Sequence, residues 1–203
     1  MIWFTADYHL GHLFMLRGMV DENGELLPGQ RVPRPMFSSV EEMNETIIER
    51  HNSVVRPGDL VYNLGDWALK ITQKEALSLR RRFIANQYFV SGNHDSIAKS
   101  LPGAWVWIKT LETIKPKIDG IPPITLCHYA MRVWNGSHRN NYHLYGHSHG
   151  MLPEDPCSLS MDVGVDCHNF YPVSVEQVHA RMLEKLPARL EYLEKLKGSR
   201  RAE

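Results

Sequence analysis

Side chains that can bind metal ions follow a series of short apolar runs in this sequence. They are carboxylates, an amide and imidazoles, namely Asp7, His9, Asp66, Asn93, His128, His147 and His149. Hard oxygen donors mixed with imidazole, without a thiolate, suit Mn, Fe, Zn or a related divalent ion. Seven residues are too many for one tetrahedral site, but they fit two metal ions that share a bridging carboxylate.

These residues fall into five short motifs, at 7–9, 65–66, 92–95, 128 and 146–149, and each motif has an ordinary explanation when it stands alone. The stretch GHSHG (146–150) fits a solvated loop as well as a pair of imidazoles that point the same way from extended backbone. Gly65-Asp66 is typical of a turn, and an isolated His128 is typical of a core histidine. The five motifs taken in order, each at the end of an expected strand, favour a shared site.

Composition and charge bound the class of protein. The chain has 203 residues with 43% hydrophobic and 23% charged side chains, which predicts a single domain over residues 1–203. Lys plus Arg is 23 and Asp plus Glu is 23, so there is no basic excess to indicate nucleic-acid binding. Three cysteines without CxxC spacing argue against a disulfide framework. With no long apolar stretch or leader-like start, we expect a cytoplasmic protein and no membrane partner.

The positions of the motifs depend on strands that alternate with helices. Apolar runs predict strands over residues 2–6, 59–64, 88–92, 124–129, 143–145 and 159–165. Strands that alternate with helices, followed by a strand-rich second half, indicate an α/β or α+β layered domain. The candidate ligands would then collect at the carboxyl ends of strands, where open α/β sheets bind their ligands.

Three helices begin at recognisable caps. Ser39 with Glu42 and Thr72 with Glu75 predict two helix starts, and Ser174 opens a C-terminal helical segment over 174–197. Its apolar stripe of Met182, Leu186, Leu190 and Leu193 predicts core packing, and Pro187 is expected to kink or divide the helix. The basic clusters at 80–82 and 197–201 are expected to be solvated helix faces.

The segment from Asp21 to Phe37 is rich in glycine, proline and charge. This composition predicts a flexible insertion that could serve as a lid. Arg34, within it, is expected to have no role at the site. Asp162 and His168, which follow the last motif, are likewise assigned none.

Together, the blocks DYH, GD, GNHD, the isolated His128 and GHSH resemble those of the calcineurin-like metallophosphoesterases. The resemblance spans residues 7–149, and FTADYHLGH and HYAMRVWNGS are similar to a compact branch of that superfamily. It implies a two-sheet β-sandwich flanked by helices, with a two-metal site at one edge. By that likeness Asp7, His9 and His149 bind the first ion, and Asn93, His128 and His147 bind the second. Asp66 would bridge both ions.

The resemblance also implies a reaction. Two ions about 3.5–4 Å apart can hold a bridging hydroxide at neutral pH and neutralise phosphate oxygens during in-line attack. In the family, the histidine that matches His94 assists the leaving-group oxygen. Asp95 is then expected to orient His94 by a hydrogen bond, unless it caps the following short helix.

The substrate is expected to be a small phosphate ester, with a nucleotide as one candidate. Ser91 stands where the phosphoprotein-phosphatase branch has an arginine, which favours a diester. Arg132 and His12 are candidate substrate-binding residues, although either fits a surface position. The alternatives are a phosphomonoesterase, a nuclease of the same superfamily, or a non-catalytic metal-binding scaffold. A scaffold should have lost His94 or several ligands, and a nuclease should carry a basic surface.

Overall fold

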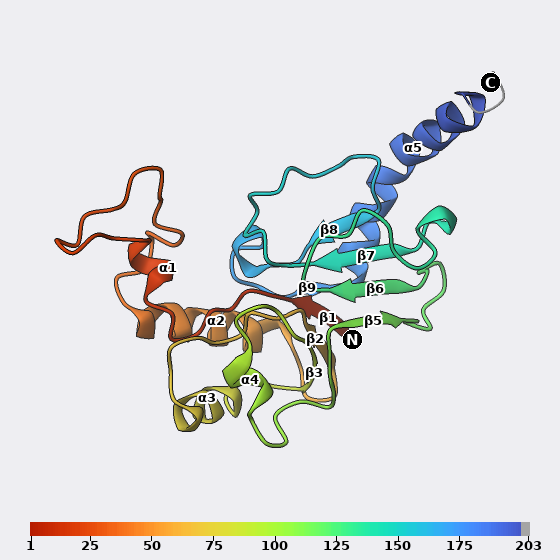
Figure 1. Ribbon diagram of the computed structural model, residues 1–203. Helices are drawn as coiled ribbons and strands as arrows, with labels where there is room; N and C mark the ends of the chain where they lie inside the picture. Colours follow the sequence, from red (N-terminus) through yellow and green to blue (C-terminus); the bar gives the residue numbers. More distant parts are fainter. Residues whose placement is uncertain (200–203) are drawn as a thin grey trace.

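The computed structural model describes residues 1–199, with side chains up to Leu196, and contains two mixed β-sheets. The five-stranded sheet has the order β4-β3-β2-β1-β9, and its strands are β1 (Ile2–Thr5), β2 (Leu60–Asn63), β3 (Asn86–Val90), β4 (Ile108–Lys109) and β9 (Val173–Ser174). The four-stranded sheet has the order β5-β6-β7-β8, and its strands are β5 (Leu111–Ile114), β6 (Ile124–Cys127), β7 (Tyr142–Tyr145) and β8 (Ser160–Asp162). All neighbouring strands are parallel except the edge pairs β1–β9 and β5–β6. The carboxyl ends of β1, β2 and β3 therefore meet at one edge (Figure 1).

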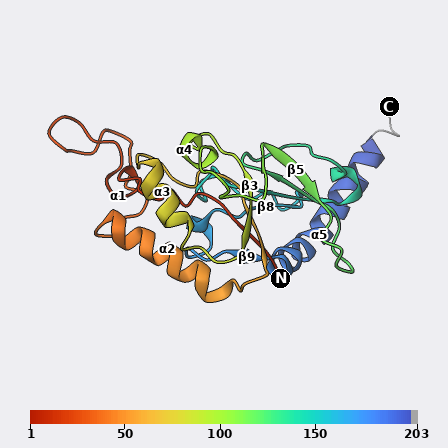
Figure 2. The ribbon, with the colours of Figure 1, turned by 90° about the horizontal axis from the view of Figure 1, so that it is seen from below.

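Helices lie beside the five-stranded sheet and after the last strand (Figures 1 and 2). They are α1 (Phe14–Arg17), α2 (Val40–Val54), α3 (Gln73–Arg80), α4 (Ser96–Lys99) and α5 (Val175–Ser199), with 3-10 turns η1 (Ser137–Arg139) and η2 (Val165–Cys167). The predicted starts of α2 and α3 are confirmed. The Ser39 hydroxyl accepts from the Glu42 amide, and Thr72 forms a complete capping box with Glu75.

Two buried cores explain the layered arrangement. One core joins the two sheets, because Phe4 and Leu64 of the five-stranded layer pack in one cluster with Ile124, Leu126 and Leu144 of the other. A second core packs the helices against the five-stranded sheet, and it includes residues of α2, α3, α4 and β3. The layered α/β organisation predicted from the sequence is thus present. Within residues 1–199, no helix has both the length and the apolar character that a bilayer span requires.

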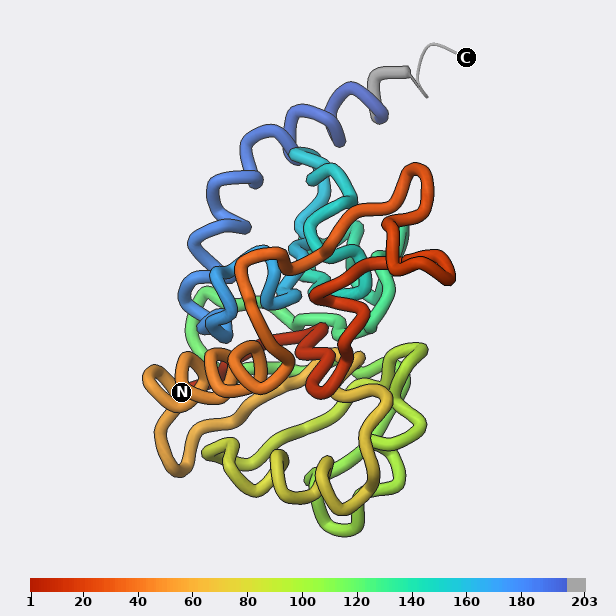
Figure 3. Tube along the Cα trace, turned by 90° about the vertical axis from the view of Figure 1, so that its left-hand side faces the viewer, coloured from red at the N-terminus to blue at the C-terminus, as the bar shows by residue number. Residues whose placement is uncertain are grey.

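The C-terminal helix differs from expectation in two ways. It continues through Pro187, so division of the helix there is wrong, while the alternative of a kink stays a prediction. Met182 is buried and Leu186 packs against the core, but Leu190 is 47% exposed, so the second half of the predicted stripe is not core. Here α5 runs past the sheets (Figures 1 and 3) and has no layer to cover. The side chains of the basic cluster 197–201 lie outside the described residues.

The segment between α1 and α2 extends away from the sheets and then returns (Figures 1 and 2). Its tip is exposed, but Arg34 on its returning arm is fully buried. The flexible insertion predicted over residues 21–37 stays a prediction, and the buried side chain of Arg34 ties its returning arm to the body.

Candidate metal centre

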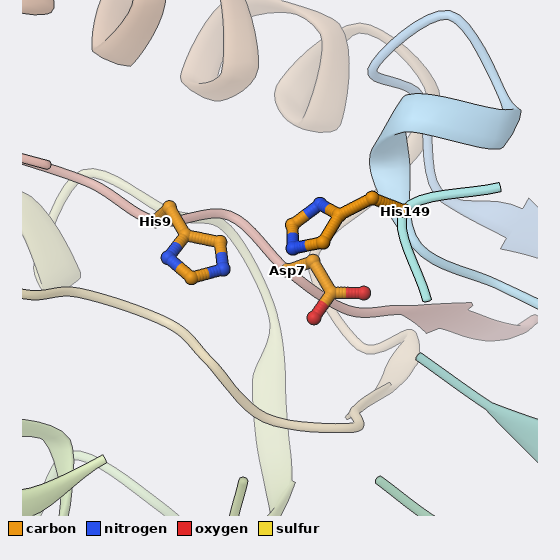
Figure 4. A group of neighbouring side chains, drawn as sticks. All are labelled: Asp7, His9 and His149. Atoms are coloured by element: carbon orange, nitrogen blue, oxygen red, sulfur yellow. The ribbon is translucent and has the colours of Figure 1, made fainter. Parts of the chain in front are cut away.

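The seven candidate ligands come together at the edge where the two sheets meet. Two groups of side chains offer ligand atoms within 4.8 Å of one another: Asp7, His9 and His149 in one, and Asp66, His128 and His147 in the other. Figure 4 shows the three side chains of the first group, with the His149 imidazole next to Asp7 and the His9 imidazole farther from the carboxylate. The grouping is the one that the resemblance implies.

Asp66 lies between the two groups. Its Oδ2 atom is 3.6 Å from Nε2 of His9 and 3.5 Å from Nε2 of His128. The Asn93 amide oxygen lies 3.1 Å from the same nitrogen of His128. One carboxylate oxygen thus faces ligand atoms of both groups, which is the position that a bridging ligand needs.

Backbone hydrogen bonds fix the loops that carry these ligands. The amide of Asp7 donates to the carbonyl of Gly65 at 2.9 Å, and the amide of His9 donates to the carbonyl of Asp66 at 2.9 Å. The amide of His147 donates to the Asp7 carboxylate, at 2.9 Å to its nearer oxygen. The turns after β1, β2 and β7 are therefore joined directly, although they come from both sheets.

Five of the ligand residues have left-handed backbone, which non-glycine residues rarely adopt. The φ angles are 59° at Asp7, 50° at His9, 53° at Asp66, 67° at His147 and 47° at His149. Such conformations cost roughly 1–3 kcal/mol each and persist only where the surroundings impose them. The expectation of extended backbone for the GHSH histidines is wrong, and the sharp turns instead send the two imidazoles to different groups.

Two glycines allow the loops to approach this closely. A Cβ atom on Gly92 would lie 2.4 Å from Oδ1 of Asp66, and one on Gly146 would lie 2.6 Å from Cβ of Ala6. Both positions therefore have to lack a side chain. This explains the glycine that precedes the ligand in GNHD and in GHSH.

Hydrogen bonds at Nδ1 leave Nε2 of His128 and of His9 facing the site. His128 uses Nδ1 against the carbonyl of Leu64 at 2.7 Å, which directs Nε2 into the site. Nδ1 of His9 lies 3.2 Å from Nδ1 of His12, and Nε2 of His9 is buried without a hydrogen-bond partner among residues 1–199. A buried polar atom without a partner is costly, and a divalent cation would satisfy it. The residues present therefore fit a pair of divalent ions.

The carboxylates of the site differ in their ionisation. Burial raises the pKa of Asp7 from 3.8 to about 7, only partly opposed by the charges of His149 and His128. Burial also acts on Asp66, but the hydrogen bond and charge of His128 outweigh it and lower the pKa of Asp66 to about 2. Burial lowers the pKa of His9 well below its usual value. Asp7 is thus a buried carboxylate that lacks a full counter-charge, which a bound cation would supply.

His94 lies beside the first group, next to the rings of His9 and His12. The residue is exposed, and its ring centroid is 5.8 Å from that of His9 and 6.3 Å from that of His12. Its backbone amide donates to Asp66 at 2.9 Å, which fixes the main chain but not the ring. Burial and the charge of His94 lower the pKa of His12 to about 4, so His12 is neutral at pH 7.

Asp95 does not orient His94 as the sequence predicted. It is fully buried, and its carboxylate accepts from the amides of Asp66 at 2.7 Å, Trp67 at 2.9 Å and Gly92 at 2.6 Å. Nor does this side chain cap α4. Asp95 instead joins the loop after β2 to the loop after β3, both of which carry ligands.

Arg132 is less closely associated with the site. It is exposed in the segment between β6 and β7, and among residues 1–199 no hydrogen bond or ion pair fixes its side chain. The substrate role predicted for Arg132 stays a prediction. The same segment holds Tyr129, whose ring contacts the imidazoles of His128 and His147 with centroids 5.0 Å and 4.8 Å apart.

Asp166 was not predicted from the sequence, and the expectation that Arg34 has no role at the site is wrong, because both residues contact it. Asp166, in η2, accepts from or shares a proton with Nδ1 of His149 at 2.7 Å. Arg34 donates to both carboxylate oxygens of Asp166, at 2.8 Å and 2.9 Å. Asp166 follows a strand as the ligands do, and that signal could have found it. Arg34 stands in a proline-rich loop, where its composition gives no such signal.

Comparisons with known proteins show relatives but no assigned activity. No protein-family model matches the chain. The uncharacterized protein MJ1445 of Methanocaldococcus jannaschii is 30% identical over 193 residues, which cover 91% of this chain and 92% of that protein. The crystal structure of AQ665, a protein of unknown function from Aquifex aeolicus, has a TM-score of 0.62 at 18% identity, covering 88% of this chain and 97% of that one. The second likeness concerns the fold alone.

Proposed function

The chain belongs to the same family as MJ1445 of Methanocaldococcus jannaschii, and we propose that it is a two-metal-dependent hydrolase of phosphate esters, with diesters preferred. The observation that carries this proposal is Asp66, whose single oxygen faces ligand atoms of two histidine-containing groups. Two mixed sheets with a shared core and a ligand cluster at one edge support a metallophosphoesterase-like sandwich.

The ligand groups divide between two ions in this proposal. Asp7, His9 and His149 would hold one ion, and the other would be held by Asn93, His128 and His147, with Asp66 shared. When bound, Mn, Fe or Zn ions would supply an acidified water molecule and neutralise charge on the phosphate.

The remaining residues act on the substrate. His94 donates a proton to the departing oxygen, because it is an exposed histidine that adjoins the ligand groups without belonging to either. His12 is neutral and lies against both His9 and His94, where it can contact a substrate oxygen. Arg132 would contact a non-reacting phosphate oxygen as a charged donor.

Two features support the preference for a small diester. Ser91 has no cationic side chain with which to clamp the dianionic end of a monoester, and its backbone amide is occupied by the carbonyl of Lys109 at 2.8 Å. The chain carries equal numbers of acidic and basic residues, so a long nucleic acid gains no general electrostatic attraction. A nucleotide-sized substrate fits both features. Three free cysteines favour a reducing, cytoplasmic setting.

The test is a metal-reconstituted assay. The chelator-treated protein is loaded with Mn²⁺, and kcat/KM is measured for an aryl phosphodiester and for the matching monoester at one pH. We expect hydrolysis of both, a higher value for the diester, and loss of activity in chelator and in Asp66→Ala. A higher value for the monoester would favour the phosphomonoesterase alternative. Two bound ions without hydrolysis of either ester would refute the proposed activity and favour a scaffold.

A further inference from the structure

The contact between Arg34 and Asp166 connects the segment before α2 with the metal centre. The Arg34 guanidinium is fully buried and donates to both oxygens of Asp166, to the carbonyl of Asp7 at 2.6 Å and to the carbonyl of Tyr8 at 2.9 Å. One side chain therefore holds η2 and the end of the β1 turn together. Its fifth donor contact is the sulfur of Met43, at 3.3 Å.

Asp166 carries this contact onward to a ligand. Its Oδ2 atom is 2.7 Å from Nδ1 of His149, so the other ring nitrogen, Nε2, is the one left for the site. The amide of Val165, beside it, donates to the carbonyl of Ala6 at 3.1 Å, which fixes η2 to the end of β1. A carboxylate behind a histidine sets the orientation of the ring and raises its basicity as a ligand.

We infer that Arg34 and Asp166 are positioning residues for the first metal site, and that through them the segment 18–38 is coupled to metal binding at Asp7, His9 and His149. The inference rests on the metal centre in the proposed function, but not on phosphate-ester hydrolysis. Arg34 enters the site from the segment that departs from the body after α1. The position of the returning arm and the orientation of the His149 ring therefore both depend on the buried pair of Arg34 and Asp166.

The arm also forms one wall of a cavity at this site. The cavity has a volume of about 420 Å³, and its lining includes Arg31, Pro33 and Met36 from the arm together with His149 and Asp166. Arg31 and Met36 are exposed. Movement of the arm would therefore change the shape of this cavity and the orientation of the His149 ring at the same time.

Coupling of this kind is reciprocal. If the arm in its described position favours metal binding, then a bound metal ion must favour that position of the arm. Two measurements therefore report on one interaction: the affinity of the first site, and the accessibility of the arm. The exposed Arg31 supplies the second, because trypsin cleaves after arginine and the next residue, Val32, permits it.

The affinity experiment uses the His147→Ala background, which removes one ligand from the second group and leaves the first to report. The dissociation constant for Mn²⁺ is measured by calorimetry. Asp166→Asn should weaken binding roughly 10–100-fold, as expected when a partner behind a ligand is lost. The matched control is Asp59→Asn, because that carboxylate accepts from the Trp3 indole and the Arg56 amide before β2, away from the ligand groups, and the substitution should change the constant less than about threefold.

A second variant guards against loss of folding. Arg34→Met alone leaves the Asp166 charge without its partner, so the double variant Arg34→Met/Asp166→Asn removes both charges of the pair together. It should fold, as judged by circular dichroism, and bind Mn²⁺ as weakly as Asp166→Asn. Mn²⁺ should slow tryptic cleavage at Arg31 in the unaltered chain and have no such effect in the double variant.

Wild-type affinity in both Asp166→Asn and the double variant would overturn the inference. So would cleavage at Arg31 that Mn²⁺ leaves unchanged in the unaltered chain. A chain that binds no ion at the first group would overturn both the inference and the proposed function. A chain that binds ions with these dependences and hydrolyses no phosphate ester would refute the proposed function alone.

Discussion

Replacing Asp7 by asparagine should stabilise the metal-free protein while abolishing its first metal site. The carboxyl is fully buried, and burial raises its pKa to about 7 from 3.8. At about 1.4 kcal/mol for each tenfold change, ionising this group in the folded protein costs about 4 kcal/mol at pH 8. An asparagine side chain at this position would carry no charge and could still accept from the amide of His147.

The direction of the pH dependence of stability follows from proton binding by Asp7. Because the folded-state pKa of Asp7 lies above the unfolded value, the folded protein binds more protons between pH 4 and pH 7. Its stability therefore falls as the pH rises through that range and levels off above it. The cost on the same relation is about 2 kcal/mol at pH 5 and about 4 kcal/mol at pH 8. The advantage of Asp7→Asn should therefore grow by about 2–3 kcal/mol from pH 5 to pH 8.

Urea unfolding in chelator at pH 5 and pH 8 measures this advantage. The matched control is Asp21→Asn, since backbone hydrogen bonds from Glu25 and Asn23 lower the pKa of Asp21, and its carboxyl is ionised in both the folded and the unfolded protein over this range. Its free-energy difference from the unaltered protein should stay constant. Addition of Mn²⁺ at pH 8 should reverse the order, because the ion stabilises the protein with the intact ligand set. An advantage of Asp7→Asn that does not grow with pH would refute the assigned cause.

Three further substitutions test individual roles. His94→Asn should retain both ions yet lose roughly 10²–10⁴ in rate on an alkyl ester; metal stoichiometry with alkyl and aryl rates checks this, and full alkyl activity would exclude a proton donor. Asp95→Ala should lower the free energy of unfolding by at least about 3 kcal/mol, because two buried amides and one half-buried amide lose their acceptor; an unchanged urea midpoint would contradict that role. Burial lowers the pKa of His51 to about 4, below its unfolded value of 6.5. The unaltered protein should therefore lose about 2 kcal/mol more than His51→Gln from pH 7 to pH 5, and equal losses in urea titrations would count against it.

The strands that carry the ligands could be predicted because they are buried on both faces. Parallel strands under helices read as apolar runs, and a ligand comes directly after such a run in β1, β2 and β7. The edge strands β4, β5 and β9 were missed. Two of them are two residues long, and Ile108 in β4 is exposed, so no apolar pattern marks them. The apolar stripe of α5 led to the opposite error, a prediction of burial that the structure does not show for its second half. Apolar residues at helical spacing occur whether or not another layer covers that face of the helix.

Contacts between residues far apart in the sequence could not be predicted from local sequence patterns. Asp95 follows a histidine in the sequence, but its buried carboxylate turns to amides from another loop. The salt bridge between Arg34 and Asp166 joins residues 132 positions apart, and neither belongs to a recognised block. The left-handed backbone at Asp7, His9 and three other ligands opposes residue preference and is imposed by the loops that surround it.

The junction of the two sheets at the ligand cluster bears on the order of folding. The amide of His147 reaches the Asp7 carboxylate across 140 residues of sequence, so neither ligand group is complete until both layers have docked. The complete metal sites therefore form only after the layers dock, and metal binding should slow unfolding far more than it speeds refolding. The metal-bound protein would therefore be kinetically stable: the ions join the two layers late in folding, and they would have to dissociate before the layers separate.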